Sequence, residues 1–88
     1  MLSSKKILVA DDDRGASVLL TARLRALGYD VGPVAATLEE ACDRAVRELP
    51  SAVMLSLSLV DGIGGGFGAV RGQFAMPVVF IAPLVTAG

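Results

Sequence analysis

The sequence predicts a single α/β domain built on a parallel sheet. Two observations lead to this class: short apolar runs alternate with segments of helical spacing, and 53% of the 88 residues are apolar. Strands that alternate with helices are typical of parallel sheets with right-handed crossovers. The mean hydropathy of +0.65 excludes a disordered chain and indicates a filled core or a surface that needs a partner.

The first strand is expected over residues 5–10, an apolar run between lysines and aspartates that favours burial on both faces. Asp13 is the expected N-cap of the helix that follows, and Gly28 is expected to end it. Apolar residues at helical spacing mark the face of this helix that we expect to be buried. They are Val18, Leu19, Ala22, Leu24 and Leu27.

A second, weaker strand is expected over residues 30–36, at the edge of the sheet, because Pro33 cannot donate to a strand ladder. Thr37 and Glu40 then form the sequence pattern of a capping box, which predicts the start of a second helix. Its apolar face would comprise Leu38, Ala41, Ala45 and Leu49, and Pro50 would end it.

The third and fourth strands are expected over residues 52–59 and 77–82. A crossover helix belongs between them, with Phe67, Val70 and Phe74 on its apolar face. Six glycines in this segment each disfavour a helix by about 1 kcal/mol relative to alanine, so we expect only a short helix over residues 67–74.

Composition excludes several classes of function. Eight basic and nine acidic residues nearly cancel and form no basic stripe, so we do not expect nucleic acid binding. No histidine is present, which excludes a Cys/His zinc site and a histidine-activated nucleophile. The lone Cys42 is interpreted as a small core residue. No segment has the length or character of a signal peptide or a membrane span, so we expect a cytoplasmic protein away from membranes.

Function in open parallel sheets is found at the carboxyl ends of the strands. In this sequence those positions hold Asp11 and Asp12 after the first strand, Ser56 within the third, and Ala82 at the end of the fourth. Asp11 and Asp12 are acidic side chains suited to a hard divalent cation.

Five stretches, in this order, resemble the receiver domain of bacterial response regulators, the CheY-like family. They are KKILVADDD, RLRALGYDV, TLEEACDRAVRELP, SAVMLSLSLVDGIGG and MPVVFIAPL. The resemblance implies a flavodoxin-like sheet with strand order 2-1-3-4. It also implies that Asp11 and Asp12 match the acidic pair that holds Mg²⁺, that Ser56 stands at the phospho-accepting aspartate, and that Ala82 stands at the Ser/Thr switch position.

The departures from the family pattern predict a degenerate receiver, or pseudo-receiver. Ser56 has no carboxylate, Ala82 has no hydroxyl, and the family's fifth strand and catalytic lysine have no counterpart in residues 1–88. We therefore expect no enzymatic activity, only weak Mg²⁺ binding, and a role in two-component phosphorelay signalling through protein–protein interaction. Expected partners are a histidine kinase or another signalling protein, and a homodimer is an alternative because the fourth strand would be an apolar edge.

Three alternatives stay open at this point. One is a conventional phospho-accepting response regulator, and another is a truncated fragment with no function of its own. The third is a nucleotide-binding α/β enzyme fragment, because Gly64, Gly66 and Ala69 fit the pattern G-x-G-x-x-A. That fingerprint requires an acidic residue about twenty positions later, and no Asp or Glu follows Asp61.

Overall fold

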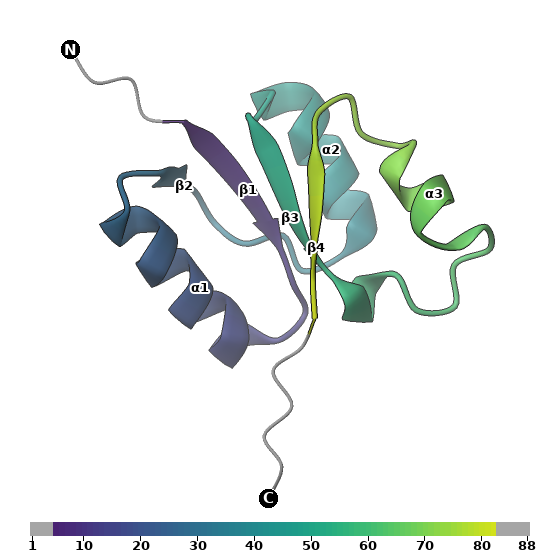
Figure 1. Ribbon diagram of the computed structural model, residues 1–88, viewed down its shortest axis with the longest axis horizontal. Coiled ribbons are helices and arrows are strands. Elements are labelled where there is room, and N and C mark those ends of the chain that lie inside the picture. The colour runs from purple at the N-terminus through teal and green to yellow at the C-terminus, as the bar shows by residue number, and fades with distance from the viewer. Residues whose placement is uncertain (1–4, 83–88) are drawn as a thin grey trace, which may run out of the picture.

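The computed structural model describes residues 5–82, which form a four-stranded parallel sheet flanked by helices (Figure 1). The strand order is β2-β1-β3-β4, and every pairing is parallel. The predicted fold class and strand order are therefore confirmed. In chain order the elements are β1 (Lys6–Ala10), α1 (Arg14–Ala26), β2 (Asp30–Val31), α2 (Leu38–Glu48), β3 (Ala52–Ser56), the 3₁₀ turn η1 (Leu57–Leu59), α3 (Gly66–Arg71) and β4 (Val78–Ile81).

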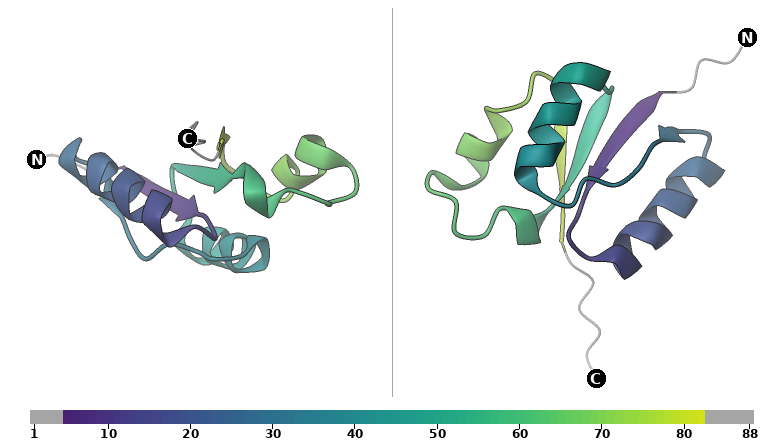
Figure 2. Two further views of the ribbon diagram at one scale, coloured as in Figure 1. Left: turned by 90° about the horizontal axis from the view of Figure 1, so that it is seen from below. Right: turned by 180° about the vertical axis from the view of Figure 1, so that it is seen from behind.

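Two apolar layers lie on opposite faces of the sheet. Alternate side chains of β1 divide between them, with Ile7 and Val9 in the layer under α1, and Leu8 and Ala10 in the layer under α2 and α3. Seen from behind, α2 lies in front of the sheet (Figure 2). The apolar run of β1 is thus buried on both faces, as its composition predicts.

The buried face of α1 differs from the predicted one. Among the apolar residues expected there, only Leu24 is buried, and Val18 is 68% exposed. The stripe that meets the sheet instead includes Ser17 and Thr21. The Ser17 hydroxyl is satisfied there because it donates to the carbonyl of Arg14 at 3.1 Å, whereas the buried Thr21 hydroxyl has no hydrogen-bond partner.

Strand β2 is at the edge, as predicted, but it is shorter than residues 30–36. Its ladder covers Asp30–Val31 only, and a single further bridge joins Ala35 to Ala10. Pro33 lies in the gap, where it supplies no N–H to a ladder.

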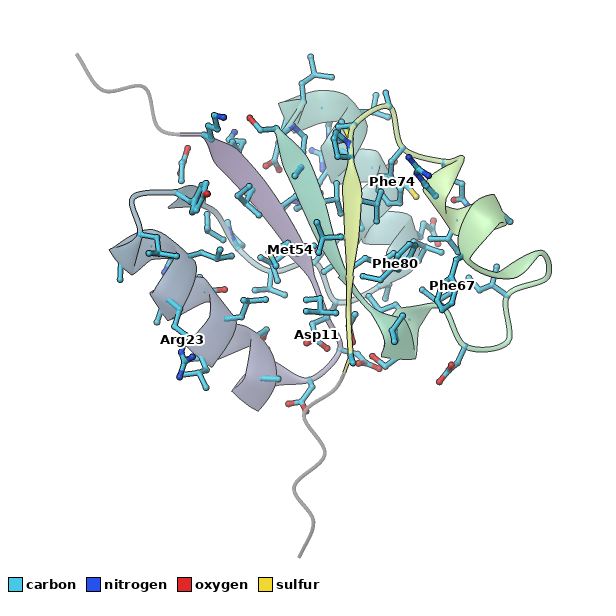
Figure 3. The ribbon with its side chains drawn as sticks, in the orientation of Figure 1. Asp11, Arg23, Met54, Phe67, Phe74 and Phe80 are labelled. Atoms are coloured by element: carbon cyan, nitrogen blue, oxygen red, sulfur yellow. The ribbon has the colours of Figure 1, made fainter. Side chains whose placement is uncertain are left out.

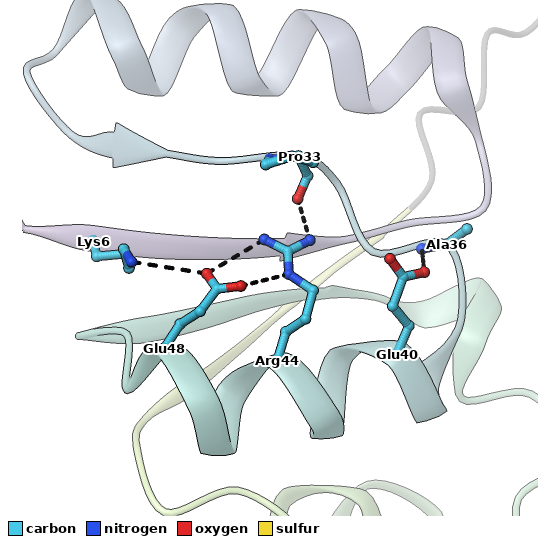
Figure 4. Close-up of polar contacts among 6 residues, drawn as sticks. All are labelled: Lys6, Pro33, Ala36, Glu40, Arg44 and Glu48. Atoms are coloured by element: carbon cyan, nitrogen blue, oxygen red, sulfur yellow. Dashed lines mark hydrogen bonds and ion pairs between the residues drawn. The ribbon is translucent and has the colours of Figure 1, made fainter.

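Helix α2 begins at Thr37, whose hydroxyl accepts a hydrogen bond from the Glu40 N–H at 3.1 Å. The return bond runs to Ala36 instead of Thr37: the Ala36 N–H donates to the Glu40 carboxylate at 3.0 Å (Figure 4). Leu49, expected on the buried face, is the C-cap in a left-handed conformation (φ 48°) and is 72% exposed. A left-handed residue leaves the helical path, so its side chain leaves the helix face.

A buried cation that the sequence did not reveal ties α2 to the sheet (Figure 4). Arg44 is 8% exposed, and its guanidinium donates to the Glu48 carboxylate at 2.7 Å and to the carbonyl of Pro33. Lys6 of β1 approaches the same carboxylate at 3.9 Å. The hydrogen bond from Arg44 is the main reason that the pKa of Glu48 lies below its ordinary value.

The second half of the chain is more irregular than predicted. Strand β3 ends at Ser56 instead of residue 59 and gives way to η1. Helix α3 is short, as predicted, but ends at Arg71 instead of residue 74. Val70 is buried, whereas Phe67 is 55% exposed and stacks on Phe80 of β4 with ring centroids 4.9 Å apart (Figure 3). Strand β4 is the second edge of the four-stranded sheet.

Candidate functional site

The carboxyl ends of β1, β3 and β4 meet at one edge of the sheet. Ala10 is in register with Leu55, and Ser56 is in register with Ile81. The strand pairing therefore brings Asp11 and Asp12 beside Ser56, with Ala82 following on the far side. Figure 3 shows Asp11 at this end of the molecule.

Three side chains form a continuous hydrogen-bonded path across this edge. The Ser58 hydroxyl donates to Oδ1 of Asp12 at 2.6 Å, and the hydroxyl oxygens of Ser56 and Ser58 are 2.8 Å apart. The Ser58 N–H also points to the Ser56 hydroxyl, at 3.4 Å. We call Ser56, Ser58 and Asp12 the serine relay. It joins positions 46 residues apart in the chain.

The direction of the protons in the serine relay follows from the number of hydrogens. A hydroxyl has one hydrogen, and that of Ser58 is used toward Asp12. Ser56 must therefore donate its own hydrogen to Ser58. Ser56 is only 2% exposed, so its hydroxyl is held inside the protein by its neighbour and is not presented to solvent.

The carboxylates of this edge are already engaged within the chain. Oδ1 of Asp11 accepts the Asp13 N–H at 2.9 Å, and Oδ1 of Asp12 accepts the Ser58 hydroxyl. Asp13 caps α1 by accepting the Ala16 N–H at 3.2 Å, as predicted. Between residues 5 and 82 no group of three His, Cys, Asp or Glu side chains is placed to hold a metal ion. Mg²⁺ takes oxygen ligands in near-octahedral geometry, and Asp11 and Asp12 are the carboxylates at this edge that could supply two of them.

Two further residues at this edge are Ala82, which was predicted, and Ser58, which was not. Ala82 is exposed and presents only a methyl group at the end of β4. Ser58, which the sequence analysis missed, is the residue that connects the others. The sequence did contain a signal for this contact, since Ser56 and Ser58 are two positions apart near the end of a predicted strand. We expected the strand to continue through Leu59, which would have placed Ser58 within the ladder.

Cys42 is half-buried and lies outside both apolar layers, contrary to its interpretation as a core residue. Its thiol contacts the amide oxygen of Gln73 at 3.2 Å and so links α2 to the segment after α3. Burial, with a smaller effect from the charge of Asp43, raises the pKa of the Cys42 thiol. A raised pKa lowers the thiolate fraction, which is unfavourable for a nucleophile.

The glycine-rich segment has a conformational explanation. Gly65 and Gly66 both have positive φ, 88° and 62°, at the start of α3. A Cβ on Gly65 would lie 2.7 Å from that of Ala69. The backbone therefore needs glycine here whether or not a nucleotide binds.

Among residues 5–82, no helix has the length and apolar character that crossing a membrane requires.

Comparison with known proteins gives a consistent result at the level of structure. No family model matches the chain, and no match is found among curated proteins. The receiver domain of the PhyR response regulator from Erythrobacter litoralis is 33% identical, with a TM-score of 0.71 over 91% of this chain. The receiver domain of a modulated diguanylate cyclase from Desulfovibrio desulfuricans is 29% identical, with a TM-score of 0.73 over 90% of this chain.

The chain has the fold of CheY-like receiver domains. A third similar structure, a variant of the anti-anti-sigma factor PhyR from Bartonella quintana, is 22% identical with a TM-score of 0.74 and supports the fold alone. The chain spans 34% of that protein, and 64% and 65% of the two receiver structures above. Two of these similar structures, those from Erythrobacter litoralis and Desulfovibrio desulfuricans, are receiver domains of signalling proteins.

Proposed function

We propose that this receiver domain does not accept a phosphoryl group and signals through protein–protein interaction. The observation that carries the proposal is the state of Ser56. By the family resemblance it stands at the position of the acceptor carboxylate, and in the structure it is 2% exposed and its only hydroxyl hydrogen is directed to Ser58. Phosphoryl transfer to a carboxylate depends on electrostatic stabilisation by cations and donors around it. Here the acceptor carboxylate is absent, and within residues 5–82 no group of three acidic side chains is placed to hold a cation.

Mg²⁺ binding at Asp11 and Asp12 is expected to be weak, in the millimolar range or weaker. Each carboxylate already accepts a hydrogen bond on one oxygen, which leaves only its other oxygen free of a protein donor for a cation.

The surface of α1 supports an interaction role. Val18 is 68% exposed and Leu19 is 53% exposed, and the two are consecutive residues of the helix. Contiguous exposed apolar surface marks sites that contact other proteins, and these two residues supply exposed apolar area on one helix. We propose that this part of α1 contacts a histidine kinase or another signalling protein. Because PhyR is an anti-anti-sigma factor, an anti-sigma factor belongs among the partners to be tested.

Phosphotransfer and binding are tested separately. The wild-type protein and the Ser56→Asp variant are incubated with acetyl phosphate and Mg²⁺, and with a phosphorylated histidine kinase, and are then analysed by intact mass spectrometry. We expect no phosphoryl adduct on the wild-type chain. An adduct on the wild-type chain under either condition would refute the proposal.

Binding is tested with exposed-residue variants of α1 against purified kinase and anti-sigma domains. Val18→Ser and Leu19→Ser should weaken the complex while leaving the unfolding transition unchanged, because both side chains are mostly in solvent. Leu27→Ser is the matched control: it is 75% exposed and lies about 12 Å further along the helix, at its C-cap. Equal loss of binding in all three variants would count against a specific surface. Sedimentation of the free domain distinguishes a homodimer from a complex with a different protein.

A further inference from the structure

We propose that Ser58 closes the carboxyl end of the sheet in place of a divalent cation. The family resemblance implies that Asp11 and Asp12 after β1 would hold a Mg²⁺ ion, and the strand pairing brings these residues beside Ser56 at the end of β3. The serine relay joins the same two places: Ser58 bonds Asp12 at 2.6 Å and Ser56 at 2.8 Å. On this view the edge is held by the chain itself, and its geometry does not depend on metal.

The length of the Asp12 bond supports this assignment. A separation of 2.6 Å is in the range of a hydroxyl that donates to a charged carboxylate, and such bonds are stronger than those between neutral groups. Within residues 5–82 the ion pairs involve Glu48 only, so the Ser58 hydroxyl is the side-chain donor that meets the charge of Asp12.

The local fold fixes Ser58 for this task. Strand β3 stops at Ser56, which is the N-cap of η1, and the turn brings residue 58 back over the end of the strand. Ser58 is half-buried, whereas Asp12 is exposed. A cation that binds Asp12 through Oδ1 must therefore compete with a hydroxyl that the η1 backbone already holds in position.

The inference predicts that removing one hydroxyl strengthens metal binding. In Ser58→Ala, Asp12 is released from its donor, and the dissociation constant for Mg²⁺ at this edge should fall by about tenfold or more. Ser58→Thr keeps the hydroxyl and should bind Mg²⁺ as weakly as the wild type. Ser51→Ala is the matched control, because Ser51 is exposed at the opposite end of β3.

The measurement is a Mg²⁺ titration followed by amide NMR, read at Asp11, Asp12 and residues 56–58. Amide hydrogen exchange of Ser58 is recorded in the same samples without metal. It should speed up in Ser58→Ala and be slowed again by Mg²⁺. If Ser58→Ala does not fold, Ser58→Cys, with a weaker donor of similar shape, serves for both readouts.

Unchanged or weaker Mg²⁺ binding in the variant without the Ser58 hydroxyl would overturn the inference. An equal increase in Mg²⁺ affinity in Ser58→Ala and in Ser51→Ala would also overturn it. The inference rests on the proposed function only in that both concern a site without an acceptor carboxylate. A phosphoryl adduct on the wild-type chain would refute the proposed function but would not alter these affinities, so the two failures can be told apart.

Discussion

Restoring an aspartate at position 56 should destabilise this domain in the absence of metal. Ser56 is 2% exposed, and its hydroxyl is linked to Asp12 through bonds of 2.8 Å and 2.6 Å. A carboxylate in its place would lie about 5 Å or less from that of Asp12. At an effective dielectric constant of about 20, two like charges at about 5 Å repel by about 3 kcal/mol. The folded state should lose stability of that order at neutral pH.

Urea unfolding of Ser56→Asp and Ser56→Asn measures this loss. Asparagine has nearly the same shape without the charge, so the difference between the variants isolates the repulsion from the steric change. We expect Ser56→Asp to be less stable by about 3 kcal/mol at pH 7 without Mg²⁺. The gap should narrow with saturating Mg²⁺, since a cation between two carboxylates offsets their repulsion. Equal stability of the two variants without metal would refute the proximity on which this reasoning depends.

Three further predictions concern stability. Glu48→Gln should cost about 1–2 kcal/mol at pH 7 through the lost bond from Arg44. Since the pKa of Glu48 is lowered in the folded state, its contribution to stability is present above the unfolded pKa of about 4 and disappears as pH falls through the folded pKa. Urea unfolding across this range should show the stability difference between wild type and Glu48→Gln closing. The exposed control Glu39→Gln should show no such change. Thr21→Val should raise the melting temperature, because the buried Thr21 hydroxyl has no hydrogen-bond partner; a lower value would mean that the hydroxyl is bonded in solution. Leu49→Gly should stabilise by about 1 kcal/mol in thermal unfolding, since φ is 48° and the side chain is mostly in solvent; a loss would show that the side chain has a packing role.

The parts of the fold that were predictable rest on strong local signals. The apolar run of β1, the Asp13 cap and the Thr37 cap each have one physical cause that lies within a few residues, and each is found where the sequence predicts it. Helix α1 shows why its buried face was not predictable. Leu19 looks more suited to a core than Thr21, yet packing against the sheet selects the stripe that contains Thr21. The burial of Arg44 depends on a distant carbonyl, which no local pattern reveals.

The position of the candidate site could be predicted from the sequence, but the hydrogen bonds that join its side chains could not. Asp12 and Ser56 were predicted to lie at one edge of the sheet, from their places near strand ends and from the family resemblance. Parallel register does place those strand ends together. The hydroxyl of Ser58 could not be placed in the same way. It depends on β3 ending at Ser56, and the residues that follow are apolar enough to read as a longer strand.

The serine relay also bears on how such a domain could signal. A ligand or modification shifts a conformational equilibrium only when it interacts differently with the two states. In the proposed function Ser56 gains no phosphoryl charge, and Ala82 has no hydroxyl with which to follow one. The edge therefore lacks the two groups that would give a phosphorylated state different contacts. Signalling would then depend on the presence and concentration of the domain, with the exposed part of α1 at Val18 and Leu19 available to partners at all times.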